Sequence, residues 1–147
     1  MSTPPSRPRM TGIGRVLVIV YAIMALAATG RSFVQIVQRF DEAPLAYSLS
    51  ALAAVVYILA TLALVFSASA IWYRIAWVAI GFELAGVLIV GTLSFVLPDL
   101  FAHPTVWSWF GGGYLLVPLV LPFLGLWWLW THRARVTAQP HTASVAP

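Results

Sequence analysis

The sequence predicts an all-α, polytopic membrane protein, a four-transmembrane-helix bundle with both termini cytoplasmic. Of its 147 residues, 61% are hydrophobic and only 8% are charged, whereas about 25% of an ordinary soluble domain is charged. A soluble fold of this size cannot bury so much apolar surface, so lipid must solvate most of it. The apolar residues also form four long runs, and most of the arginines lie at the ends of these runs.

The four apolar runs predict the transmembrane spans. A helix needs about 20 apolar residues, at 1.5 Å each, to cross about 30 Å of hydrocarbon. The predicted spans are 15–38, 45–67, 73–97 and 107–131, within a transmembrane domain at 13–133. The fourth run reaches this length only if the glycines at 111–113 are helical. Segment 1–12, with its prolines and arginines, is predicted to be a disordered basic arm, and 134–147 a disordered tail.

The arginines predict the orientation of the spans. Six of the eight fall on one side of a four-span arrangement, namely Arg7, Arg9, Arg15, Arg74, Arg133 and Arg135. Since positive residues favour the cytoplasmic side, this side is predicted to be cytoplasmic. Two groups of aromatic residues are expected to form interfacial belts. The cytoplasmic belt would contain Trp72, Tyr73, Trp77, Trp127, Trp128 and Trp130, and the outer one Trp107, Trp109, Phe110 and Tyr114.

A cleavable signal peptide is an alternative interpretation of the first span. Three arginines, an apolar core and then Ala25-Leu26-Ala27 fit such a signal. We favour a retained span for two reasons. Helical apolar patterning continues past Ala27, and removal of the first span would leave only three helices to bury Glu83. The other spans would keep their orientation in either case.

Glu83 is the clearest candidate for a polar site inside the membrane. A charged residue near the centre of a span raises the free energy of membrane insertion by at least about 2.5–3.5 kcal/mol, so its presence needs an explanation. Glu83 lies ten residues after Tyr73, which places it near the midplane. It could carry a proton or pair with a substrate, or it could hold helices together by hydrogen bonds. We favour the structural role, because a single acid supplies no relay. Tyr57, on the second span, is the best partner by depth.

The end of the first span is amphipathic. Arg31, Gln35, Gln38 and Arg39 share one helical stripe, opposite a stripe of apolar residues. Either the helix continues through the outer leaflet, or Gly30 lets the chain turn along the membrane surface. We favour the continuous helix, in which the stripe would line an interior cavity above Glu83. Arg31 lies about 9 Å from the level of Glu83, so it could reach inward or extend outward to the interface.

Pro118 and Pro122 predict a kink in the fourth span. Neither proline can donate a hydrogen bond to the carbonyl group four residues earlier, so two acceptors are freed on one helix face. The kink could line a pathway for a solute or lipid, as in broken transporter helices. We favour a static bend whose carbonyls are satisfied by neighbouring groups.

The absence of several residue types narrows the function. There is no cysteine, which excludes disulfide and thiolate chemistry. No histidine lies inside a span to bind haem, and no acidic cluster or serine and histidine pair is placed for catalysis. We therefore predict no catalytic residue, no cofactor, no metal and no nucleic-acid partner. The chain is not expected to be an enzyme.

Two segments carry a resemblance. GRSFVQIVQRFDEAPLAYSLSALAAVVYILAT at 30–61 and VWSWFGGGYLLVPLVLPFLGLWWL at 106–129 resemble small four-span integral membrane proteins of actinobacteria that carry no assigned function. The resemblance covers about residues 14–130. It implies a multi-pass protein of the bacterial plasma membrane, without implying an activity.

Two functions are consistent with these features. The first is a non-enzymatic accessory or scaffold subunit that packs against a membrane protein partner or lipid. The second is a small transporter or flippase-like component that uses Glu83 and Arg31 in an intramembrane polar cavity. Since four short helices enclose little volume, the second function would favour a homo-oligomer.

Overall fold

The computed structural model describes residues 12–132, which form an all-helical chain without strands. Its elements, in order, are α1 (Ile13–Arg39), η1 (Phe40–Glu42), α2 (Pro44–Val65), α3 (Ala70–Val96), η2 (Ser108–Tyr114) and α4 (Val117–Thr131), where η denotes a 3₁₀ helix. The predicted tail at 134–147, and all of the predicted arm at 1–12 except Gly12, lie outside the described residues.

Three of the helices are long and apolar enough to cross a membrane. These are α1, continued by η1, together with α2 and α3. A fourth span exists only if η2 and α4, which are bent by 99° relative to each other, count as one. The chain is therefore a membrane-embedded helical protein with three, or up to four, candidate spans.

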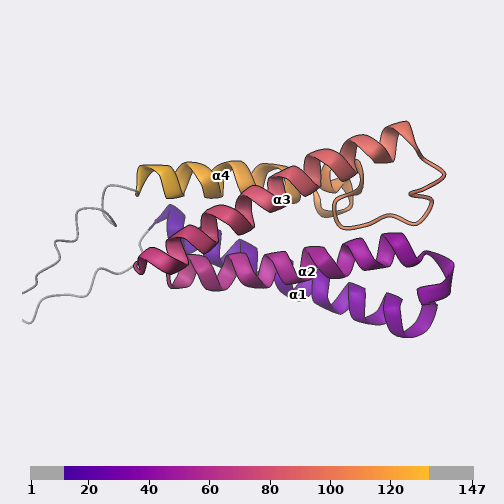
Figure 1. Ribbon diagram of the computed structural model, residues 1–147, viewed down its shortest axis with the longest axis horizontal. Helices are drawn as coiled ribbons and strands as arrows, with labels where there is room; N and C mark the ends of the chain where they lie inside the picture. Colours follow the sequence, from indigo (N-terminus) through magenta and orange to yellow (C-terminus); the bar gives the residue numbers. More distant parts are fainter. Residues whose placement is uncertain (1–11, 133–147) are drawn as a thin grey trace, which may run out of the picture.

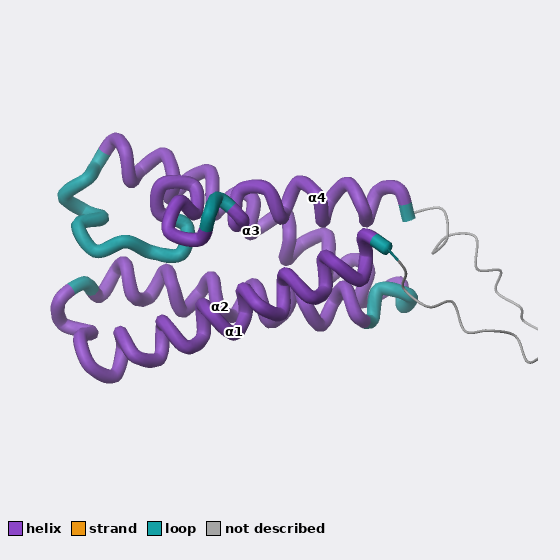
Figure 2. Tube along the Cα trace, turned by 180° about the vertical axis from the view of Figure 1, so that it is seen from behind, coloured by secondary structure: helices purple, strands orange, loops and turns teal. Residues whose placement is uncertain are grey.

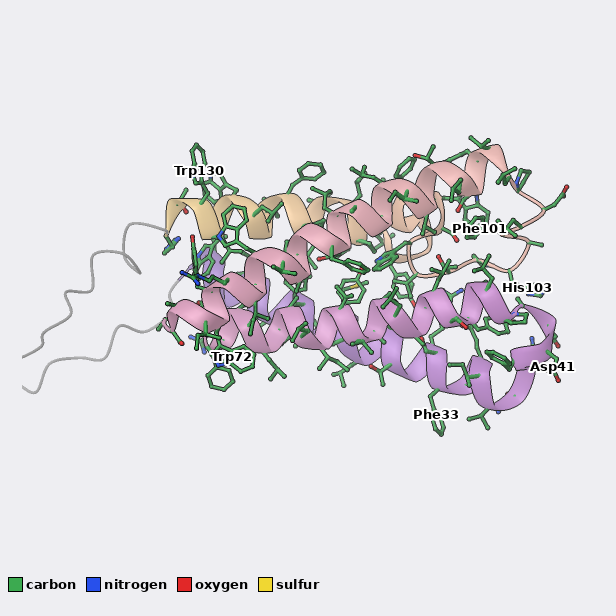
Figure 3. The ribbon with its side chains drawn as sticks, viewed as in Figure 1. Phe33, Asp41, Trp72, Phe101, His103 and Trp130 are labelled. Atoms are coloured by element: carbon green, nitrogen blue, oxygen red, sulfur yellow. The ribbon has the colours of Figure 1, made fainter. Side chains whose placement is uncertain are left out.

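The helices lie roughly along one axis, and the bundle has two distinct ends (Figure 1). At one end, which we call the loop end, η1 joins α1 to α2, and residues 97–107 connect α3 to η2. At the other, the terminal end, α1 begins, α4 ends and a short turn joins α2 to α3. Trp72 and Trp130 lie at the terminal end, and Asp41 and His103 at the loop end (Figure 3).

Helix α1 is continuous through Gly30, which confirms the favoured prediction for the amphipathic segment. Its buried residues recur every three or four positions, which is the spacing of one helix face, and include Leu17, Tyr21, Met24, Ala28 and Ser32. Helix α2 buries a similar row of small residues, Ala46, Ser50, Ala53, Ala60 and Ala63 among them. Small side chains let two helices approach closely, and α1 and α2 form an extensive antiparallel contact.

Helix α3 diverges from α2 toward the loop end. The 97–107 connection and η2 lie at this end of the bundle (Figure 2). Hydroxyl groups help to fold this connection. The Oγ atom of Ser108 accepts a 2.8 Å hydrogen bond from the backbone N–H of Thr105, and the Thr105 hydroxyl accepts one from the backbone N–H of Trp107. The chain thereby turns back into the bundle instead of remaining at the surface.

The fourth predicted span is not one kinked helix, which corrects the sequence prediction for 107–131. Residues Trp109, Phe110, Gly111, Leu115 and Leu116 have positive φ angles, so the chain coils tightly before α4 begins. Pro118 lies in the first turn of α4, where a missing N–H costs nothing. It therefore starts a helix and does not kink one, and only Pro122 lies inside α4.

Close packing explains why the coil contains glycine. A Cβ atom on Gly111 would lie 2.6 Å from the ring of Pro118, and the φ of +80° at Gly111 is one that other residues rarely adopt. The sequence Gly-Gly-Gly before a proline therefore predicts a break in the helix more directly than it predicts helical glycines.

Candidate functional site

Glu83 lies at the centre of the bundle. It is the middle residue of α3, which has 27 residues, and its side chain is 0% exposed. The face of α3 that carries it also buries Ile80, Val87 and Val90. The carboxyl group therefore lies midway along α3 and inside the bundle.

Tyr21 is the hydrogen-bond partner of Glu83. Its hydroxyl group donates to Oε2 of Glu83 at 2.6 Å, and the tyrosine is itself 0% exposed. Gly125 of α4 leaves room for this hydroxyl group, because a Cβ atom there would lie 3.3 Å from the tyrosine oxygen. Sequence reasoning missed Tyr21, although it is the one tyrosine on the apolar face of the first span.

Tyr57 lies near the carboxyl group of Glu83, with no hydrogen bond to it among the described residues. Its ring centroid is 6.2 Å from that of Tyr21. The Tyr57 oxygen accepts a 3.2 Å hydrogen bond from Nε1 of Trp107. We call Tyr21, Tyr57, Glu83 and Trp107 the central cluster.

Trp107 was predicted to belong to an interfacial aromatic belt, and the structure corrects this. It is 2% exposed and reaches from the loop end into the middle of the bundle. Gly86, less than one turn beyond Glu83 on α3, makes room for its ring, since a Cβ atom at Gly86 would lie 2.6 Å from the indole. The ring of Phe110 packs against Gly91 in the same manner.

The carboxyl group of Glu83 is not fully satisfied. Oε2 accepts the bond from Tyr21, whereas Oε1 has no hydrogen-bond partner among the described residues. A buried polar oxygen without a partner is uncommon in folded proteins and calls for an explanation.

Arg31 belongs to a different network. Its Nη2 atom donates a 2.7 Å hydrogen bond to the carbonyl oxygen of Pro104, and its guanidinium carbon lies 5.9 Å from the centre of the Tyr114 ring. Arg31 therefore holds the loop and η2 at the loop end. Among the described residues, Arg31 and Glu83 share no hydrogen bond.

The remaining residues of the predicted polar stripe diverge in their surroundings. Gln35 is half-buried, and its Oε1 atom has no partner, whereas Gln38 is exposed. The stripe runs past the part of α1 that other helices cover, so its last turn faces outward. Only Arg31 and Gln35 therefore contribute to the interior, and Gln38 does not.

The central cluster offers groups for hydrogen bonding and proton exchange. Among residues 12–132, no group of three or more His, Cys, Asp or Glu side chains is placed to hold a metal ion. Comparison of the chain with protein-family models, with curated proteins and with solved structures finds no match. Function must therefore be argued from this geometry.

Proposed function

We propose that the protein is a non-enzymatic accessory or scaffold subunit of the bacterial plasma membrane that packs against another membrane protein. In this proposal η2 and α4 complete a fourth span, and both termini are cytoplasmic. The bias of arginines toward the terminal end supports this orientation.

The observation that carries the proposal is an exposed, apolar, non-helical turn directly before α4. Helix α4 has 15 residues, so it extends about 22 Å and falls about 8 Å short of crossing the hydrocarbon. The residues just before it, Leu115 and Leu116, are non-helical, and Leu115 is 91% exposed. The N–H groups of Leu115 and Leu116 both donate to the carbonyl oxygen of Gly111, so this turn offers a partner its apolar side chains.

The chemistry of this surface suggests the kind of partner. The side chains of Leu115 and Leu116 are apolar. A helix of another membrane protein that offers an apolar face would pack against them.

A photo-crosslinking amino acid at position 115 tests the proposal in native membranes. The control is the same amino acid at Leu26, which is 76% exposed on the lipid face of α1. We expect position 115 to give one stoichiometric protein adduct, identified by mass spectrometry, and position 26 to give lipid adducts. Lipid adducts at both positions would contradict the accessory role.

A second candidate function is transport of protons or of a substrate coupled to protons through Glu83. The unpartnered Oε1 atom at the middle of α3 favours it, because intramembrane carboxyl groups often serve as proton carriers. In reconstituted vesicles, flux driven by a pH gradient should be lost in Glu83→Gln. Equal flux in the variant, or none in either protein, would rule this candidate out.

A further inference from the structure

The buried polar groups are distributed unequally about Glu83. Apart from Glu83 itself, and Ser67 in the turn after α2, the buried polar residues within 12–132 all lie toward the loop end. They are Ser32, Ser50, Ser94, Thr105 and Ser108. Toward the terminal end the core is apolar, with Leu17, Leu64, Ile80 and Leu129 almost fully buried. A polar path from Glu83 therefore leads in one direction only.

Three of these serines continue the faces that carry the central cluster. Ser32 lies eleven residues from Tyr21, Ser50 seven from Tyr57, and Ser94 eleven from Glu83. Separations of seven and eleven residues bring two side chains to the same face of a helix. The Oγ atoms of Ser32 and Ser50, like Oε1 of Gln35, have no hydrogen-bond partner within residues 12–132, and groups of this kind normally bind water.

Trp107 stands between this polar path and Glu83. Its indole ring fills the space over Gly86, and its N–H is bonded to Tyr57. An indole N–H can donate a hydrogen bond but cannot accept one. The contact between Tyr57 and Trp107 therefore ends the hydrogen-bonded chain and cannot relay a proton.

We propose that Glu83 is a proton-binding site that exchanges with the aqueous phase at the loop end, and that the Trp107 indole is the gate for this exchange. The packing supports a proton as the ligand, because Tyr21, Tyr57, Glu83 and Trp107 are each at most 2% exposed. Departure of the indole from Gly86 would let water reach Glu83 along Ser50 and Ser94. The inference deepens the second candidate function, on which it rests for its physiological use.

The groups around Glu83 favour a proton as the positive charge that neutralises its carboxylate. The titratable groups that face it are Tyr21 of α1 and Tyr57 of α2, and Tyr114 of η2 lies near Tyr57. Residues 117–131 of α4 include no titratable side chain, and Arg31 is bonded to the loop. A buried carboxylate without a cation is costly, whereas the protonated acid is neutral.

The segment that carries the gate is strained. Trp109 and Phe110, directly after Trp107 and Ser108, have φ angles of 52° and 58°, in a region that residues other than glycine rarely adopt. Such strain persists only where packing enforces it and is common in segments that switch between conformations. Displacement of Trp107 would therefore be opposed by packing and favoured by release of this strain.

Infrared difference spectroscopy of the full chain in lipid vesicles measures the exchange. The C=O stretch of a protonated carboxyl group moves on transfer from H₂O to D₂O, and its absence in Glu83→Gln assigns the band. Gly86→Ala places a methyl group against the indole, whereas the matched control Gly81→Ala on the same helix meets nothing within 4 Å. We expect exchange of the Glu83 proton to be about tenfold faster in Gly86→Ala than in wild type, because the added methyl group makes displacement of the indole easier. Exchange in Gly81→Ala should be unchanged.

Two outcomes would overturn the gate. One is equal exchange in wild type and Gly86→Ala, and the other is the absence of any band that Glu83→Gln removes. If Gly86→Ala does not fold, Trp107→Phe replaces it as the test of the gate, because this variant keeps an aromatic ring but loses the hydrogen bond to Tyr57. Exchange must then be faster in Trp107→Phe than in wild type, and an unchanged rate overturns the proposal.

The side of access is tested by a pH jump outside the vesicles. The chain has no cysteine, so labelling of a cysteine introduced at Ala102 reports which vesicles expose the loop end. The Glu83 band should respond at once only in those vesicles, and a prompt response from the terminal end would overturn loop-end access. Normal exchange at Glu83 with no flux in the wild type would contradict the transport function and leave the gate standing. Unaltered exchange in the variants would contradict the gate.

Discussion

The hydroxyl group of Tyr21 on α1 donates a 2.6 Å hydrogen bond to Oε2 of Glu83 on α3, which joins residues 62 positions apart at the centre of the bundle. Neither helix would bury its polar group alone, since each needs the other as partner. The bond therefore fixes which faces of α1 and α3 point toward each other at the centre of the bundle.

Removal of this hydrogen bond should destabilise the protein. Tyr21→Phe leaves Oε2 of Glu83 without its donor, and we expect a loss of about 1–3 kcal/mol in the free energy of unfolding. The measurement is reversible unfolding in mixed micelles, followed by circular dichroism. Tyr47→Phe is the control, because Tyr47 is buried on α2 but its hydroxyl group makes no hydrogen bond among the described residues. Equal losses in the two variants would show that the bond to Glu83 contributes nothing.

Three glycines of α3 should respond differently to alanine. A Cβ atom on Gly86 meets the Trp107 ring at 2.6 Å, one on Gly91 meets the Phe110 ring, and one on Gly81 meets nothing. We expect Gly86→Ala and Gly91→Ala to lose about 1–3 kcal/mol through overpacking. Gly81→Ala should gain up to about 1 kcal/mol through helix propensity. A gain in all three, measured by the same unfolding assay, would contradict the packing of the loop against α3.

Loss of Arg31 should loosen the loop end without unfolding the bundle. Arg31→Ala removes the bond to the Pro104 carbonyl and the contact with the Tyr114 ring, worth about 1–2 kcal/mol together. Amide hydrogen exchange of residues 97–107 should therefore become about tenfold faster or more. Arg39→Ala, at an exposed position on the same helix, is the control and should leave exchange unchanged. Protection of the loop in both variants would contradict the role of Arg31.

Glycine at Leu115 should separate stability from assembly. Leu115 has a φ of 57° and is 91% exposed, and the left-handed conformation costs a side-chain-bearing residue about 1–2 kcal/mol. Leu115→Gly should therefore stabilise the isolated protein in unfolding experiments. It should also reduce crosslinking of the partner from a photo-crosslinker at Leu116, because an apolar contact is lost. Unchanged crosslinking would indicate that no partner covers Leu115.

Cysteine scanning should establish the number and orientation of the spans. The chain contains no cysteine, so single cysteines can be introduced at Ser6, Ala68, Ala102 and Ala138. In intact cells, we expect an impermeant thiol reagent to label only Ala102→Cys. The other three should react only after permeabilisation. Labelling of Ala138→Cys in intact cells would indicate three spans, and labelling of Ser6→Cys would contradict a cytoplasmic N-terminus.

The central cluster was only partly predictable from the sequence. Glu83 and Tyr57 could be placed at similar depths because each residue adds 1.5 Å along a helix. Tyr21 was missed, because depth alone cannot tell which side of a helix faces which neighbour. Trp107 was assigned to the wrong place, since tryptophan before an apolar run is typical of an interface and only the folded loop brings it over Gly86.

The loop end was also only partly predictable from the sequence. The amphipathic stripe of α1 correctly predicted a continuous helix, because its periodicity does not change at Gly30. The direction of Arg31 was open, since a long side chain can reach partners on either side. Its hydrogen-bond acceptor is the carbonyl oxygen of Pro104, 73 positions away in the chain.

Sequence alone determined the environment of this protein and the course of its first three helices, because composition and apolar run length are set residue by residue and do not depend on contacts. It also determined that one acid would be buried near the middle of α3. Only the tertiary structure decided the partners of that acid, the separation of Glu83 from Arg31 and the coil that precedes α4. These depend on which helix faces meet and on the space left by Gly86, Gly91 and Gly125, which contacts between distant segments create.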